Sequence, residues 1–200
     1  ESCDCYFYEL AKKINIDDLS KLATNLGLNN TYNIGLSNAQ KGLIPNKKWK
    51  KSNLEQGWYQ GETLITSIGQ GYNLTSPLQL ASLYSALLNG GRFPSPKLIK
   101  NEPSKYLGEE LNSNHQKAIL NALKAAVQEP SGTAYKLNLD NPNFVKIGGK
   151  TGTSQVVRIK EEDREDDLYK TKEMEDRFKD HSVFVGYAPI DEPKYIASVI

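Results

Sequence analysis

The chain has 200 residues, of which 38% are apolar and 24% are charged. This length and composition suit one soluble globular domain, or part of a larger one, and exclude a collagen, a coiled coil and a fully disordered protein. With 25 basic and 24 acidic residues the net charge is +1, so the chain lacks the positive field that holds nucleic-acid phosphates, and we expect no nucleic-acid partner. The sequence shows neither a signal peptide nor an apolar run of the roughly 20 residues that span a bilayer.

Helices are predicted in the first two thirds of the chain. A short aromatic-rich helix covers residues 5–13, and apolar residues spaced three and four apart over 19–26 indicate a second helix that ends at Gly27. Residues 29–60 are rich in Asn, Gly and Lys, and we expect them to be irregular.

The strongest helix signal begins at Thr75-Ser76-Pro77, where a capping hydroxyl precedes a proline in the first turn. The helix that follows is apolar on nearly every face, which predicts a buried helix, and Asn89-Gly90-Gly91 ends it. Another helix is predicted over 113–127. Its apolar stripe is formed by Ala118, Ile119, Ala122, Leu123 and Ala126.

Strands are predicted in the last third. Residues 143–153 alternate in polarity, and residues 182–188 and 194–200 are strand-like runs joined by a proline-rich hairpin connection. A charged loop over 158–180, which we interpret as a solvated insertion, separates the first strand from this hairpin. Helices followed by antiparallel strands indicate an α+β fold, with an antiparallel sheet flanked by helices.

Several familiar chemistries find no support in the sequence. Cys3 and Cys5 are too close for an unstrained disulfide and form no C-x-x-C pair, so neither a bridge nor a zinc site is indicated. His115 and His181 lie outside any G-x-S-x-G or H-E-x-x-H pattern, and the glycines before Lys150 do not have P-loop spacing. We therefore predict no metal ion and no cofactor.

One motif carries chemistry: Lys150-Thr151-Gly152-Thr153, at the end of a predicted strand. A lysine on an edge strand places a cation beside a cleft, where it can hold a substrate carboxylate, and the two threonine hydroxyls can donate to the same group. Because Gly152 has no Cβ, a peptide can lie against the strand edge. The backbone N–H of Thr153 is then available to an oxyanion formed during acyl transfer.

A second element of such a site is a small hydroxyl with a polar partner, and Ser2-Cys3-Asp4 fits this description as S-x-D. The Ser2 hydroxyl both donates and accepts, so it can relay a proton between a lysine and a nucleophile, and Asp4 adds a charge. The candidate site residues are therefore Ser2 and Asp4 together with 150–153.

Longer segments carry a family resemblance. They are S-C-D-C-Y-F-Y at 2–8, W-Y-Q-G-E-T at 58–63, I-G-Q-G-Y at 68–72, T-S-P-L-Q-L at 75–80, G-K-T-G-T at 149–153, Q-V at 155–156 and D-H-S-V-F-V-G-Y-A-P at 180–189. In this order the chain resembles the transpeptidase domain of class B penicillin-binding proteins. The S-C-D and K-T-G-T forms resemble its elongation-specific branch most closely.

The resemblance implies a β-lactamase/D,D-peptidase-like transpeptidase fold and a serine D,D-transpeptidase that cross-links peptidoglycan stem peptides through an acyl-enzyme, in cell elongation and shape. It also implies trapping by β-lactam antibiotics, an anchor in the inner membrane with action on its periplasmic face, and a membrane-embedded glycan polymerase and elongation complex as partners. Two alternatives stay open. The first is a serine β-lactamase or a division-type penicillin-binding protein, and the second is a non-catalytic interaction module.

The sequence departs from the family at one point, because no serine is followed by lysine three positions on. The S-x-x-K nucleophile of the family is therefore missing, and we interpret residues 1–200 as the C-terminal part of a transpeptidase domain, incomplete on its N-terminal side. We expect this chain alone to be inactive and to have an unpaired edge at 194–200 that promotes association. A metal-binding role for Cys3 in the whole protein would require other ligands upstream of this chain.

Overall fold

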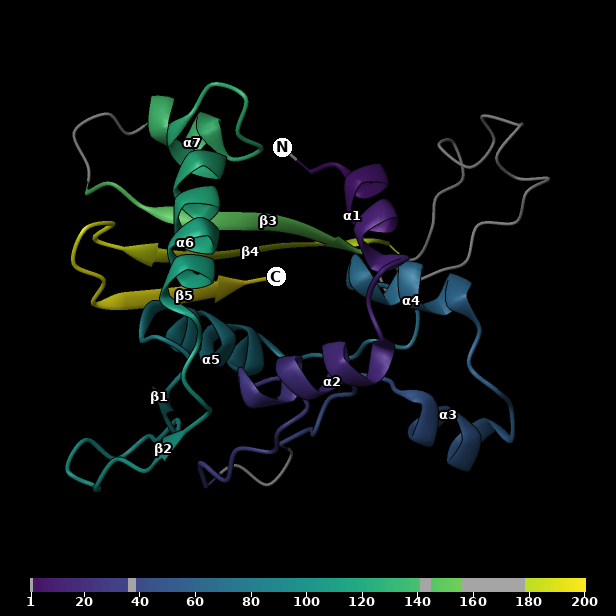
Figure 1. Ribbon diagram of the computed structural model, residues 1–200. Coiled ribbons are helices and arrows are strands. Elements are labelled where there is room, and N and C mark those ends of the chain that lie inside the picture. Colours follow the sequence, from purple (N-terminus) through teal and green to yellow (C-terminus); the bar gives the residue numbers. More distant parts are fainter. Residues whose placement is uncertain (1, 36–38, 141–144, 156–178) are drawn as a thin grey trace.

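The computed structural model describes residues 2–35, 39–140, 145–155 and 179–200. The helices are α1 (Asp4–Ala11), α2 (Ile16–Asn25), α3 (Lys47–Leu54), α4 (Gln60–Ser67), α5 (Pro77–Leu88), α6 (Ser113–Gln128) and α7 (Tyr135–Asp140). The strands are β1 (Phe93–Pro94), β2 (Tyr106–Leu107), β3 (Gly148–Ser154), β4 (His181–Ala188) and β5 (Tyr195–Val199). The α+β prediction is confirmed (Figure 1). Within the described segments, none of the helices has both the length and the apolarity that crossing a bilayer requires.

The main sheet is antiparallel, in the order β3-β4-β5, and β1 and β2 form a separate short hairpin. Lys150 pairs with Val185, and Phe184 pairs with Val199. The predicted hairpin of the last two strands is therefore confirmed. In the described part of the chain β3 and β5 form the two edges of this sheet, and α6 crosses its front in Figure 1.

The strand predicted to start at residue 143 starts at Gly148 instead. The main chain just before it is bonded elsewhere: the Ile147 carbonyl accepts from the Gln128 side chain, and the Lys146 carbonyl accepts from the Ile190 N–H. These bonds tie the segment to α6 and to the turn after β4, so it does not continue the ladder. Residues 141–144 and nearly all of the predicted charged loop at 158–180 lie outside the described residues.

Helix α5 is the buried helix that the sequence predicts. Its N-cap Ser76 accepts from the Gln79 N–H, and the Gln79 side chain accepts from the Ser76 N–H in return, which completes a capping box. Ala86 and Leu87 pack in one cluster with Leu26, Tyr32 and Phe93. A second cluster lies against the sheet and consists of Tyr84, Val185 and Tyr187. The helix thus joins the helical part of the molecule to the sheet.

Helix α6 covers the predicted residues, and its predicted apolar stripe is correct in part, because Leu123 packs against the core and Ala126 is buried. Leu120 and Leu123 pack against the core and Val127 is fully buried, whereas Ala118, Ile119 and Ala122 are exposed. Apolar residues occur on more than one side of this helix, so periodicity alone does not select the buried side. The packing of α6 on β3 and α5 does.

The predicted helix over 19–26 is confirmed as α2, but the irregular segment predicted over 29–60 is wrong in part. It contains α3, which begins after Asn46, whose side chain accepts from the Trp49 N–H at 2.8 Å. Five of the first six residues of α3, from Lys47 to Ser52, are polar, so the sequence has no apolar period that predicts this helix. Lys50 of this helix is buried against Glu62 of α4, a helix that the sequence also did not predict, and such a tertiary contact helps to order a short helix without an apolar face.

Candidate active site

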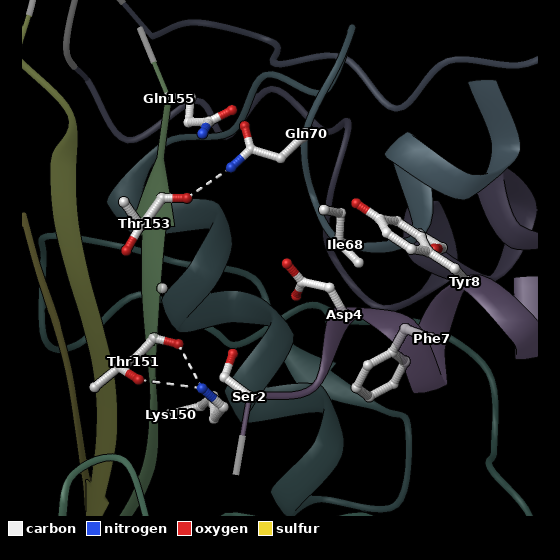
Figure 2. A pocket seen from close by; sticks show the side chains of 12 residues that line it. Ser2, Asp4, Phe7, Tyr8, Ile68, Gln70, Lys150, Thr151, Thr153 and Gln155 are labelled. Carbon is white, nitrogen blue, oxygen red and sulfur yellow. Dashed lines mark hydrogen bonds between the residues drawn. The ribbon is translucent and has the colours of Figure 1, made fainter. Parts of the chain in front are cut away.

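A pocket of about 720 Å³ lies between the start of α1, the turn after α4 and the outer edge of β3. Its lining consists of Ser2, Asp4, Phe7, Tyr8, Ser67, Ile68, Gln70, Lys150, Thr151, Gly152, Thr153 and Gln155. All six residues that the sequence singled out line this one pocket, although they come from opposite ends of the chain. Figure 2 shows Ser2 and Asp4 beside the β3 strand, on the side of Lys150 and Thr151.

Lys150 is held at the edge of β3 by three oxygen acceptors. Its ammonium donates to the Thr151 carbonyl at 2.9 Å, to the Thr151 hydroxyl at 3.1 Å and to the Thr133 hydroxyl at 3.4 Å. Partial burial lowers the pKa of Lys150, and the negative charge of Asp4 opposes this effect by raising it. The pocket therefore contains a cation whose charge is sustained by a carboxylate from another element.

Ser2 and Asp4 reach the pocket through the start of α1. Cys3 is the extended N-cap residue of this helix, and Asp4 is its first residue. A carboxylate in the first turn is favoured by the unpaired N–H groups and the dipole of the helix. In Figure 2 the Ser2 hydroxyl lies near Lys150, and Asp4 lies further along the strand. The catalytic roles of these residues remain predictions.

The hydrogen bonds of β3 fix which main-chain groups face the pocket. The Thr151 carbonyl accepts from the Lys150 side chain, and the Thr153 carbonyl accepts from the Gln70 side chain at 2.8 Å. Both carbonyls therefore point away from β4. Because the N–H and the C=O of one strand residue lie on the same edge, the N–H groups of Thr151 and Thr153 also face the pocket. Two backbone donors are thus directed at any group that lies along this edge.

The other lining residues were not predicted as site residues. Phe7, Tyr8, Ile68, Gln70 and Gln155 all lie in segments that carry the family resemblance, which was the signal available for them. Their chemistry is too general to be recognised from residue type. Ser67 lies just before one of these segments and carried no signal of its own.

Gln70 reaches β3 because of an unusual turn. Gly69 and Gly71 on either side of it have φ values of +82° and +74°, a region that residues with a Cβ rarely adopt. The side chain of Asn73 donates to the Gln70 carbonyl at 3.1 Å and to the Thr66 carbonyl at 3.0 Å. The turn is therefore fixed to the end of α4, and its geometry aims the Gln70 amide at the strand.

Among the described residues, no group of three or more His, Cys, Asp or Glu side chains is placed so that it could hold a metal ion. Cys3 and Cys5 are free and exposed, and His115 and His181 are exposed. The polar groups of the pocket are instead an ammonium, hydroxyls, one carboxylate, the side-chain amides of Gln70 and Gln155, and backbone N–H groups. This set suits an anionic, extended ligand that lies along a strand edge.

An α+β fold with a cationic edge strand opposite a serine and an aspartate is the arrangement of a D,D-peptidase-like domain. The chain belongs to the penicillin-binding protein transpeptidase domain family, whose model matches residues 1–200. This finding confirms the family resemblance and the fold that the sequence indicated.

Individual relatives agree with this assignment. The chain is 31% identical over 212 residues to the peptidoglycan D,D-transpeptidase MrdA of Salmonella typhimurium, covering 100% of this chain and 33% of the relative. It superposes on penicillin-binding protein 2 of Helicobacter pylori, solved in a complex with MreC, with a TM-score of 0.80 and 30% identity, over 99% of this chain and 34% of the other. Penicillin-binding protein 2 of Pseudomonas aeruginosa, solved with WCK 5153, gives a TM-score of 0.76 and 29% identity, over 98% and 41%. The chain thus spans about one third of the length of its curated relative.

Proposed function

We propose that the protein containing this chain is a serine D,D-transpeptidase that cross-links peptidoglycan stem peptides during cell elongation. The observation that carries this proposal is the meeting of Ser2 and Asp4 with the Lys150–Thr153 strand in one pocket. The match to the D,D-transpeptidase MrdA over the whole chain supports the same reaction.

In the proposed reaction the donor stem peptide lies along the free edge of β3. Its terminal carboxylate is held by the Lys150 ammonium and the threonine hydroxyls. The nucleophilic serine comes from the S-x-x-K segment, which the printed sequence does not contain. Its hydroxyl gives its proton to the lysine of the same segment, its oxygen attacks the penultimate D-alanine carbonyl, and the Thr153 N–H stabilises the resulting oxyanion.

Ser2 is proposed to move protons in this reaction. When the tetrahedral intermediate collapses, the bond to the terminal D-alanine breaks, and the leaving amine takes a proton through the Ser2 hydroxyl. An amine of a second stem peptide then attacks the acyl-enzyme ester, forms the cross-link and releases the serine. A β-lactam follows the first half of this course, but its leaving group stays tethered to the acyl group, so the acyl-enzyme persists.

The location and the partners are part of the same proposal. Relatives that synthesise the cell wall support action in the periplasm, and we place the anchor of the whole protein in the inner membrane. The Helicobacter pylori relative was solved with MreC, which supports an elongation complex as the partner. A membrane-embedded glycan polymerase is the further partner that we propose.

Intact mass spectrometry of the whole protein after incubation with penicillin tests this function. We expect a stable mass increase equal to one penicillin, and a second-order rate of adduct formation that falls by at least roughly 10-fold in Lys150→Ala, the effect of losing one charge-assisted contact. An adduct that hydrolyses within seconds would indicate a β-lactamase. No adduct would indicate a non-catalytic module, and either result would overturn the proposal.

A further inference from the structure

Thr133 contacts the proposed carboxylate site from outside the pocket. Its hydroxyl oxygen lies 2.9 Å from the Thr151 hydroxyl and 3.4 Å from the Lys150 ammonium. Both of these groups line the pocket, whereas Thr133 does not. The Thr133 hydroxyl therefore contacts both of the groups that we propose to bind the substrate carboxylate, the Lys150 ammonium and the Thr151 hydroxyl.

The segment that carries Thr133 is clamped to the end of α6. The Gly132 N–H donates to the Glu129 carbonyl at 2.8 Å, and the Ala134 N–H donates to the Ala126 carbonyl at 3.0 Å. A Cβ on Gly132 would overlap the Ala126 carbonyl oxygen, so only glycine allows this close approach. Ala134 is itself buried. Because both neighbours of Thr133 are fixed, its backbone is held in place, and the contacts with Thr151 and Lys150 then locate its hydroxyl.

The position of Thr133 decides how the Thr151 hydroxyl and the Lys150 ammonium are oriented. Each hydroxyl has one hydrogen to donate. Without a ligand, the Thr151 hydroxyl receives a hydrogen bond from Lys150 and gives its own hydrogen to Thr133. When a carboxylate binds, the Thr151 hydrogen turns to it, and the Thr133 hydroxyl donates to the Thr151 oxygen in return, so that Thr133 keeps Thr151 in place in both states. Without the Thr133 hydroxyl, the Thr151 hydroxyl loses one of its two partners and the ammonium loses one of its three acceptors.

We propose that Thr133 is a positioning residue of the carboxylate site: through the Thr151 hydroxyl and the Lys150 ammonium it sets the preference of the enzyme for donors that end in a carboxylate. This inference rests on the proposed function. Thr133 does not touch the donor, so its effect passes entirely through the two groups that do.

The test uses the whole protein and two acyl thioester substrates of D-alanine, one whose leaving group ends in a carboxylate and one in which a carboxamide replaces it. Wild-type, Thr133→Val and Thr133→Ser proteins are compared by kcat/KM on both. Valine keeps the shape of threonine without the hydroxyl, and because Thr133 is exposed, this change should leave the melting temperature within a few degrees of wild type. Thr133→Ala, which also lacks the hydroxyl, repeats the comparison with a smaller side chain.

We expect Thr133→Val and Thr133→Ala to lower kcat/KM for the carboxylate substrate roughly 10-fold and for the carboxamide substrate less than about two-fold. Thr133→Ser should restore the carboxylate preference. An equal loss on both substrates, or no loss on either, would overturn the role of Thr133 while leaving the proposed function intact. A wild-type protein that acylates with neither substrate would overturn the function, and the role of Thr133 with it.

Discussion

The side-chain amide of Gln70 donates a 2.8 Å hydrogen bond to the main-chain carbonyl of Thr153 (Figure 2). This bond joins the turn after α4 to the end of β3, across the pocket that holds the proposed site. It also occupies the acceptor of the residue whose N–H we propose as the oxyanion donor. The Thr153 carbonyl belongs to the peptide unit that follows Thr153, and the bond to Gln70 prevents this unit from rotating. Gln70 therefore helps to hold the edge of β3 in its geometry.

Replacing Gln70 should therefore weaken acylation without unfolding the protein. Gln70→Glu keeps the size of the side chain but has no N–H to donate, and Gln70→Ala removes the group. Loss of one hydrogen bond of about 1 kcal/mol corresponds to a fall of about five-fold in the second-order rate of penicillin acylation. Gln116→Ala is a matched control, because its amide binds the Leu87 carbonyl away from the pocket. Acylation by Gln70→Glu at the wild-type rate would show that this bond does not position the strand.

The pH dependence of acylation should respond to Asp4. Burial lowers the pKa of Lys150, and the Asp4 charge raises it. Asp4→Asn removes only the raising effect, so the ammonium should lose its proton at a lower pH. If acylation needs that charge to hold a carboxylate, the alkaline limb of the acylation rate moves to lower pH in Asp4→Asn, while a remote Asp17→Asn variant keeps the wild-type profile. A shift to higher pH, or none, would contradict this electrostatic coupling.

Gly152 offers a test of how the substrate approaches the strand. A Cβ at this position would meet only the Val183 side chain, at 3.8 Å, so Gly152→Ala fits the fold. We expect an unchanged melting temperature and slower acylation, because the methyl group projects where the peptide is proposed to lie. Gly149→Ala is the structural contrast, since its Cβ would lie 2.6 Å from the Val185 carbonyl oxygen and 2.7 Å from the Phe184 ring. That variant should be destabilised by about 1–3 kcal/mol. Normal acylation in Gly152→Ala would contradict the strand-edge approach.

Glu62 should be essential for the buried Lys50–Glu62 contact between α3 and α4. The side chain of Lys50 is 1% exposed, and its ammonium lies 2.5 Å from the Glu62 carboxylate and 4.4 Å from the centre of the Tyr59 ring. Glu62→Ala leaves a buried charge without its partner, which costs about 3–5 kcal/mol, or roughly 6–20 °C in Tm. The double variant Lys50→Met/Glu62→Leu should recover much of this loss. Equal melting of Glu62→Ala and wild type would show that water reaches the ammonium.

The 200-residue chain by itself is expected to associate and to remain unlabelled by penicillin. Within the described residues β5 pairs only with β4, and its side chains Tyr195 and Val199 are 74% and 58% exposed. An apolar strand edge of this kind recruits other chains. Light scattering should report oligomers that Val199→Lys reduces and that Lys136→Glu, a charge change on α7, does not. A monomeric chain that takes up fluorescent penicillin would refute both expectations.

Local signals in the sequence were sufficient for several elements. The capping box at Ser76 and the all-round apolar pattern after it predict α5, because capping and burial follow from residue type at fixed spacing. The strand-like runs at 182–188 and 194–200 and the proline-rich connection between them predict the hairpin of β4 and β5. The residues and the family resemblance also predict one site from Lys150–Thr153 and from Ser2 with Asp4; these residues do line one pocket, and their chemical roles stay predictions.

Only the tertiary structure decided what depends on distant partners. Helix α3 has no apolar period and is held by the buried Lys50–Glu62 pair, and the buried face of α6 is selected by packing against α5 and β3. The contacts of Gln70 with Thr153 and of Thr133 with Lys150 join segments far apart in the sequence. A sequence pattern reports which groups a residue offers. Which partner each group meets is set by how the chain folds back on itself, and this is why the other six lining residues of the pocket and its supporting hydrogen bonds emerged only from the structure.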